Sequence, residues 1–165
     1  MAKWIAILIL TAVTAVNASA GLSRLEALSM IETGDDDSAI GRLGEISRFQ
    51  IRPQVWRRYS QSSAFANRDV ASSVAQKHLD YLQSQFKART GRDATDFDLY
   101  VLWNAGFSYY ERHGFSPDRI ARLVQDRAQR YLNLRSLPES QQLLYASRLQ
   151  TRSVVRANND VPTTD

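Results

Sequence analysis

Apolar residues recur every three or four positions along much of the chain, which is the spacing of helices that pack one face against a core. Over residues 68–87, Val74, Leu82 and Phe86 follow this spacing, and His78 lies in the same stripe. The pattern predicts an amphipathic helix over 68–87. It also favours a packed histidine at position 78 over a catalytic one, because the stripe faces the core.

The helical pattern continues in three later segments. Residues 95–110 are apolar on nearly every side, which predicts a helix buried in the middle of the domain. Residues 120–132 carry one apolar face, and a shorter helix fits residues 138–150. No convincing run of strands interrupts them, so the 165 residues predict one mainly helical domain.

Residues 34–53 break this pattern with glycines and carboxylates, and they predict an irregular loop or small hairpin. In the helix expected before it, Leu25, Leu28 and Glu32 are spaced by three and four, so Glu32 continues the apolar face, and Gly34 predicts the helix end. Partial removal from water raises the pKa of a carboxyl group toward the value that a general acid needs near neutral pH. The alternative is that Glu32 is an exposed residue of the last helical turn.

The other carboxylates of this segment are weaker candidates. Asp35, Asp36 and Asp37 are consecutive, so they cannot all face one site, and most are expected to be solvated or to cap the turn. Glu45 precedes an apolar stretch and is a candidate for a second carboxylate facing a cleft. An exposed loop acid, or a partner for a nearby arginine, is the somewhat favoured interpretation of Glu45.

The two ends of the chain differ from its middle. Residues 1–20 hold one lysine, a short apolar run and a final Ala-Ser-Ala, which is typical of a secretory signal peptide cleaved after Ala20. The apolar run is shorter than a membrane span needs. Residues 151–165 lose the periodicity and predict a disordered tail. We therefore expect a domain over residues 21–150, exported to the periplasm or cell envelope without a stable membrane span.

Composition narrows the classes of function. The net charge of +4 comes from arginines scattered along the chain, which is a poor signal for nucleic-acid binding but favours loose attraction to an acidic polymer. There is no cysteine, and the two histidines have no partners at ligand spacing. The sequence therefore predicts neither disulfides nor a metal site, and no cofactor is expected.

The order of residues around Glu32 resembles the lysozyme-like domain of the soluble lytic transglycosylases. That family has a helix-ending Glu-Ser, a polar loop with a G-x-x-G-L-M-Q-I-x-P run, and a later A-Y-N-A-G block on a buried helix. The matching positions are Glu32, Thr33, Gly44, Ser47, Phe49, Gln50, Ile51, Pro53, Trp103, Asn104, Ala105 and Gly106. Thr33, Ser47, Phe49 and Trp103 depart from the family's residues. The family's Glu-Thr-Arg-x-Tyr block is only faintly echoed by residues 127–131.

The resemblance implies an α+β lysozyme-like fold in which the loop forms one wall of a glycan cleft. It implies cleavage of the β-1,4 bond between N-acetylmuramic acid and N-acetylglucosamine in peptidoglycan, with Glu32 as general acid and then base in forming a 1,6-anhydro product. The residues expected to bind the glycan or support the acid are Thr33, Glu45, Ser47, Phe49, Gln50, Ile51, Trp103, Asn104 and Tyr131. For Trp103 a core position is favoured over a stacking platform, because its whole helix is apolar.

Two other functions remain open. A muramidase of the same fold would hydrolyse the bond, with Glu45 or one of residues 35–37 activating water. A wall-binding protein that had lost activity would keep the fold, and Ser47, where the family has a glycine, is the best support for it. In all three cases the expected partner is the peptidoglycan glycan strand, and a monomer is the default expectation.

Overall fold

The computed structural model describes residues 21–138, 140, 141, 144 and 147. Its helices are α1 (Arg24–Thr33), α2 (Pro53–Trp56), α3 (Arg68–Thr90), α4 (Asp96–Ala105), α5 (Phe107–Arg112), the 3-10 helix η1 (Pro117–Arg119) and α6 (Arg122–Arg135). The prediction of a mainly helical domain is confirmed. The predicted signal peptide, the predicted tail and most of the helix predicted over 138–150 lie outside the described residues. None of the helices that the structure describes has both the length and the apolar character to cross a membrane.

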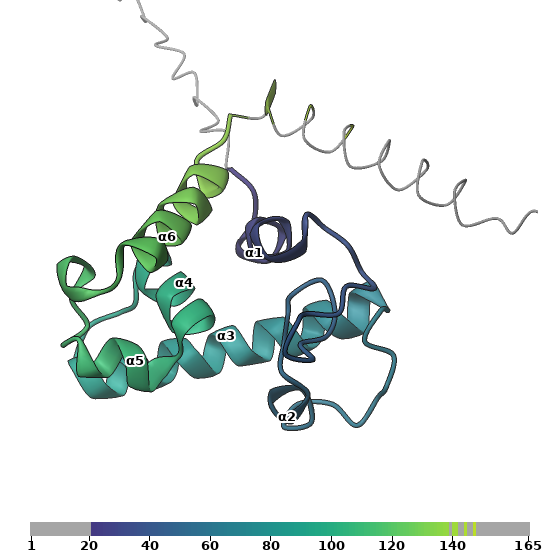
Figure 1. Cartoon of the computed structure of the whole chain (residues 1–165), viewed down its shortest axis with the longest axis horizontal. Coiled ribbons are helices and arrows are strands. Elements are labelled where there is room, and N and C mark those ends of the chain that lie inside the picture. Colours follow the sequence, from purple (N-terminus) through teal and green to yellow (C-terminus); the bar gives the residue numbers. More distant parts are fainter. Residues whose placement is uncertain (1–20, 139, 142–143, 145–146, 148–165) are drawn as a thin grey trace, which may run out of the picture.

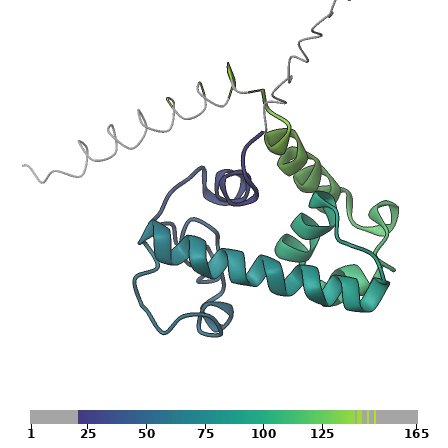
Figure 2. The ribbon, with the colours of Figure 1, turned by 180° about the vertical axis from the view of Figure 1, so that it is seen from behind.

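The longest helix, α3, runs across the whole domain, and the other elements lie along it (Figure 1). The loop before α2, and α2 itself, lie near the N-terminal end of α3, whereas α5 lies at its C-terminal end, as the view from behind also shows (Figure 2). Helix α4 contacts α3, α5 and α6, and α1 contacts both α3 and α6. Helix α4 is therefore the central element, as its apolar sequence predicts.

Capping residues fix where the first helices begin and end. Ser23 and Glu26 form a reciprocal capping box at the start of α1, and Asn67 caps α3 by accepting hydrogen bonds from two backbone N–H groups. Gly34 ends α1 and Gly91 ends α3, each with a positive φ that favours glycine. The predicted helix over 68–87 is confirmed and continues to Thr90, because this glycine stop lies farther along.

The predicted helix over 95–110 is divided in two. Gly106 adopts φ 88° and ψ 156°, a conformation that is open essentially to glycine alone, so α4 ends at Ala105 and α5 begins at Phe107. Burial on every side holds for residues 98–102, but Trp103 is only half-buried. The break turns the end of α4 away from the core and toward the cavity described below.

The start of α1, the start of α4 and the end of α6 are tied together by one carboxylate. Asp96 accepts a hydrogen bond from Arg24 at 2.8 Å and one from Arg135 at 3.0 Å. Arg135 also donates to the backbone carbonyl of Leu22. These contacts join segments separated by 72 and 39 residues, so α1 and α6 are held against α4 at this end of the domain.

Residues 34–52 form an irregular loop closed by two isolated antiparallel bridges. Ile46 pairs with Ile40 on one side and with Ile51 on the other. Ser47 (φ 66°) and Gln50 (φ 50°) both adopt the left-handed region, which is costly for residues other than glycine. The segment is therefore an irregular loop, one of the two predicted forms, held by isolated bridges instead of the paired strands of a hairpin.

Candidate functional site

A cleft of about 870 Å³ opens between the loop, α1, α3, α4 and α6. This volume lies within the range of ligand-binding pockets. Its lining residues are Ile31, Glu32, Arg42, Leu43, Glu45, Gln50, Ile51, Arg52, Val55, Arg58, His78, Tyr81, Leu82, Tyr100, Leu102, Trp103, Asn104, Ala105, Gly106, Phe107, Arg127 and Arg130. Six of the ten residues singled out in the sequence line it: Glu32, Glu45, Gln50, Ile51, Trp103 and Asn104.

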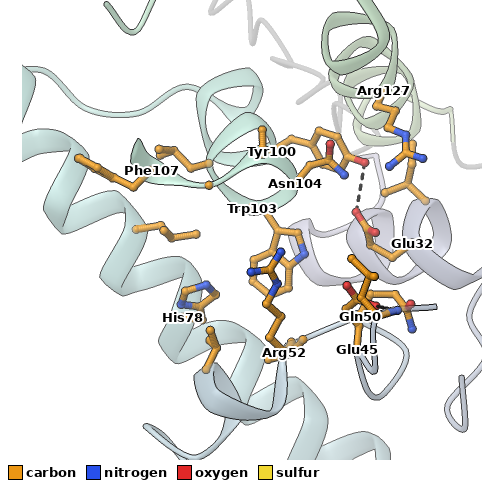
Figure 3. Close-up of a pocket in the computed structure, with 18 of the residues that line it drawn as sticks. Glu32, Glu45, Gln50, Arg52, His78, Tyr100, Trp103, Asn104, Phe107 and Arg127 are labelled. Carbon is orange, nitrogen blue, oxygen red and sulfur yellow. Dashed lines mark hydrogen bonds between the residues drawn. The ribbon is translucent and has the colours of Figure 1, made fainter. Parts of the chain in front are cut away.

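Glu32 lies in the last turn of α1 and points into the cleft (Figure 3). Burial raises the pKa of its carboxyl group above the ordinary value, and the nearby charge of Glu45 acts in the same direction. The hydrogen bond from Tyr100 and the positive charge of Arg127 oppose this rise without cancelling it. Glu32 therefore has the property of a general acid, a carboxyl group that keeps its proton at a higher pH than an exposed glutamate.

Tyr100 fixes the orientation of this carboxyl group. Its hydroxyl donates a hydrogen bond to Oε1 of Glu32 at 3.1 Å, drawn as a dashed line in Figure 3. Burial and the adjacent Glu32 charge raise the pKa of Tyr100, so the phenol remains a donor at neutral pH. With Oε1 bonded to Tyr100, Oε2 is the oxygen that can carry an exchangeable proton toward a ligand in the cleft.

The loop presents a second carboxylate and an amide to the same cavity. Glu45 and Gln50 lie close together below Glu32 in Figure 3. Oε2 of Glu45 accepts a hydrogen bond from the backbone N–H of Leu43 at 3.0 Å, and Nε2 of Gln50 donates to the carbonyl of Ser47 at 3.2 Å. Both side chains are thus held by the loop backbone. The favoured interpretation of Glu45 as an exposed loop acid is wrong, because it is half-buried and lines the cleft.

These two side chains require a glycine beside them. A Cβ atom added to Gly41 would lie 2.4 Å from Oε1 of Gln50 and 2.4 Å from Oε2 of Glu45. The backbone of Gly41 also donates to the carbonyl of Glu45 at 2.7 Å. The close approach of the loop to itself therefore determines where the carboxylate and the amide point.

The opposite side of the cleft is aromatic. The ring centroid of His78 lies 5.2 Å from that of Trp103, and the ring of Tyr81 stacks on His78 at 6.2 Å. Nδ1 of His78 is 3.2 Å from the hydroxyl oxygen of Tyr59, and burial lowers the pKa of His78 to about 4. His78 is therefore neutral near pH 7. Trp103, for which a core position was expected, is half-buried: it packs against the core and also lines the cavity.

Four of the residues singled out in the sequence do not line the cleft. Phe49 and Ser47 are buried residues of the loop itself, and Oγ of Ser47 accepts a hydrogen bond from the Phe49 N–H at 3.3 Å. Thr33 donates a hydrogen bond to the carbonyl of Arg48 at 3.0 Å, which fastens the loop to the end of α1. Tyr131 is buried and stacks on Tyr100 at 5.1 Å. All four lie behind the residues that face the cavity, where they support its walls.

The three consecutive aspartates also lie outside the cleft lining. Asp35 and Asp37 both form ion pairs with the buried Arg48 and with Arg68. Asp36 accepts a hydrogen bond from the Ser38 N–H at 3.0 Å, which caps the turn. The expectation that most of these carboxylates are solvated is wrong for the two that are ion-paired, because burial of Arg48 requires negative partners.

Tyr100 and Arg127 face the cavity and were not identified as site residues from the sequence. The signal for Tyr100 was present, because it precedes Trp103 by three residues and Asn104 by four and so lies on the same face of α4. Arg127 takes the first position of the faint Glu-Thr-Arg-x-Tyr echo, where the family has an acid. Arg127 lies at the cleft because α6 contacts α4, and the residues next to Arg127 in the sequence do not indicate that contact.

Within the described part of the chain, no three or more histidine, aspartate or glutamate side chains are grouped so that they could hold a metal ion. The cleft lining offers two carboxyl groups, amides, aromatic rings and several arginines. In comparisons with known proteins, no family model matches the chain, and neither a similar curated protein nor a similar solved structure was found.

Proposed function

We propose that this protein is a peptidoglycan lytic transglycosylase that cleaves the β-1,4 bond after N-acetylmuramic acid, with Glu32 as its general acid and base. The observation that carries the proposal is the environment of Glu32, a cleft-lining carboxyl group whose pKa is raised by burial and whose Oε1 is held by Tyr100. The resemblance of residues 32–53 and 102–106 to the soluble lytic transglycosylases supplies the substrate class.

In the proposed reaction, protonated Glu32 gives its proton to the glycosidic oxygen as the bond to the muramyl carbon breaks. The resulting carboxylate then takes the proton of the muramyl 6-hydroxyl, whose oxygen closes onto the same carbon to give the 1,6-anhydro product. The hydrogen bond from Tyr100 stabilises Glu32 while it carries the negative charge. One residue serves both steps, because donating a proton converts an acid into a base.

Gln50, Asn104 and Trp103 are proposed to hold the sugar rings. Gln50 and Asn104 offer amide groups to the cleft near Glu32, and Trp103 offers the face of an indole ring (Figure 3). Hydroxyl and acetamido groups of sugars pair with amides, whereas their apolar faces pack on aromatic rings. The combination suits a glycan better than an apolar ligand.

Hydrolysis is the second candidate, because Glu45 lines the same cleft and raises the pKa of Glu32 through its charge. A muramidase needs a second carboxylate that activates water or attacks the sugar. Glu45 is the candidate for this role because it lines the cleft. Residues 35–37 are not, since they pair with arginines or cap a turn outside the cleft. The two candidates differ in what they predict for Glu45→Gln: modest loss for a transglycosylase and near-complete loss for a hydrolase.

Mass spectrometry of soluble products released from purified peptidoglycan by residues 21–165 tests the proposal. Anhydromuramyl products that are absent with Glu32→Gln are expected. Glu26→Gln is a matched control on the same helix, because glutamine also serves in a capping box, and it is expected to retain activity. Reducing-end products would favour the hydrolase. No products from a folded wild-type protein would refute both enzymatic candidates.

A further inference from the structure

Cationic side chains line the cleft without carboxylate partners. Arg42, Arg52, Arg58 and Arg127 all contribute to its lining, and all four are exposed. Among the described residues, no carboxylate lies within ion-pair distance of any of them. The cleft therefore presents guanidinium groups whose hydrogen-bonding capacity is not used inside the domain.

Several arginines outside the cleft are paired with carboxylates. Arg92 binds Asp98 through two nitrogens at 2.7 and 3.1 Å, and Arg24 and Arg135 share Asp96. Arg48 is paired with two aspartates of the loop. Among the described residues, those four cleft-lining arginines thus differ from these paired arginines in having no carboxylate partner.

The unpaired arginines flank the cavity from separate elements. Arg127 projects from α6 beside Glu32, whereas Arg52, at the start of α2, lies next to Trp103 on the other side (Figure 3). Arg58 follows α2 and is close enough to His78 to lower the pKa of that imidazole. A ligand that spans the cleft would therefore meet positive charge on both sides of the carboxyl group that is proposed to react.

We infer that the cleft selects glycan strands that carry free carboxylates on their muramyl residues, and that Arg52, Arg58 and Arg127 bind these carboxylates. The inference rests on the proposed function for its glycan, and the charge of the ligand follows from the arginines alone. The planar guanidinium group matches a carboxylate with two parallel hydrogen bonds, which gives both affinity and orientation. The carboxylates come from the stem peptides or, where a stem is absent, from the lactyl group.

Binding of the Glu32→Gln protein to insoluble peptidoglycan, measured by cosedimentation, tests this inference without requiring cleavage. One preparation keeps its carboxyl groups and a second has them converted to amides with a carbodiimide and ammonia. The affinity for the amidated wall is expected to be at least about tenfold lower, and the affinity for the untreated wall is expected to fall with added salt. A third preparation, from which an amidase has removed the stems, keeps only the lactyl carboxylates.

Paired variants in the same background assign the effect to the cleft. The double change Arg52→Gln and Arg58→Gln is expected to weaken binding to the untreated wall by about tenfold and to leave binding to the amidated wall unchanged. Arg57→Gln, which alters an exposed arginine next to Arg58 that does not line the cleft, is expected to have no effect. Loss of binding to the stem-free wall would assign the contact to carboxylates of the stems, whereas retained binding would show that the lactyl carboxylate freed by the amidase is sufficient.

Equal binding to untreated and amidated walls would overturn the inference, and so would an Arg57→Gln effect as large as that of the double variant. Neither result would bear on cleavage, which is measured separately with the wild-type protein. Conversely, a wild-type protein that releases no product but prefers the untreated wall would refute the proposed reaction and support the carboxylate-binding cleft.

Discussion

Replacing Tyr100 with phenylalanine removes one hydroxyl group and keeps the ring that packs against Tyr131. The lost group is the donor to Oε1 of Glu32. A hydrogen bond to a charged group contributes about 1.5–3 kcal/mol, and the distance of 3.1 Å is long for a hydroxyl donor, which favours the lower value of about 1.5 kcal/mol. Because the bond stabilises the carboxylate, its removal raises the pKa of Glu32 further.

The assay is the pH dependence of kcat/KM on purified peptidoglycan. The proposed reaction needs protonated Glu32, so activity is expected to fall as the pH rises through the pKa of that group. In a kcat/KM profile this alkaline limb reports the pKa in the free enzyme. For Tyr100→Phe the limb is expected at a higher pH than for the wild type. The maximal rate is expected to fall as well, because the carboxylate formed during the reaction loses a stabilising donor.

Tyr110→Phe is the matched control. Tyr110 is also a buried tyrosine that donates to a carboxylate, Asp98 at 2.7 Å, but it does not line the cleft. This variant is expected to lose stability and to keep the alkaline limb of the wild type. An unchanged or lower limb for an active Tyr100→Phe protein would refute the reasoning that connects the phenol to the acid.

Three further predictions concern stability. Because the pKa of Glu32 is raised on folding, ionisation of this group destabilises the folded protein as the pH rises above about 4.5. The Glu32→Gln protein is therefore expected to melt at a higher temperature than the wild type at pH 7 but not at pH 4. A difference in melting temperature that does not change with pH would contradict this. The pKa of His78 is about 4 in the folded protein in place of 6.5, which corresponds to about 3 kcal/mol of folding stability that is lost as the pH falls from 6.5 to 4. Calorimetry is expected to show a smaller acid-induced loss of stability for His78→Leu than for the wild type. Asp98 is buried and accepts hydrogen bonds from Arg92, Thr95 and Tyr110. The change Asp98→Asn is expected to lower the free energy of unfolding, measured with urea, by about 3 kcal/mol. A decrease below about 1 kcal/mol would show that the partners of Asp98 rearrange.

The helices could be predicted where the signal is local. Gly34 and Gly91 end α1 and α3 through a backbone conformation that glycine adopts freely, and the apolar stripe of α3 is buried as its spacing predicts. The break at Gly106 was missed, because a glycine within an apolar run is compatible with a continuous helix. The break places Phe107 against the core, a contact between distant segments that the local sequence does not show.

The site could be predicted only in part, for a related reason. Glu32 was identified because its register on α1 is visible in the sequence. Tyr100 and Arg127 reach Glu32 from α4 and α6, 68 and 95 residues later in the chain, and no local pattern encodes that proximity. Glu45 was underestimated, since its orientation depends on the turn at Gly41 and on the hydrogen bond from the Leu43 N–H.

The ion pairs of Asp96 with Arg24 and Arg135 have a consequence for when Glu32 acquires its raised pKa. The side chains around Glu32 come from α1, α4 and α6, so its carboxyl group loses water only after these three helices have closed on one another. Without these contacts the carboxyl group of Glu32 would be hydrated, and the main cause of its raised pKa would be absent. The raised pKa of Glu32 is thus a property of the assembled helices and not of α1 alone, because burial is its largest cause.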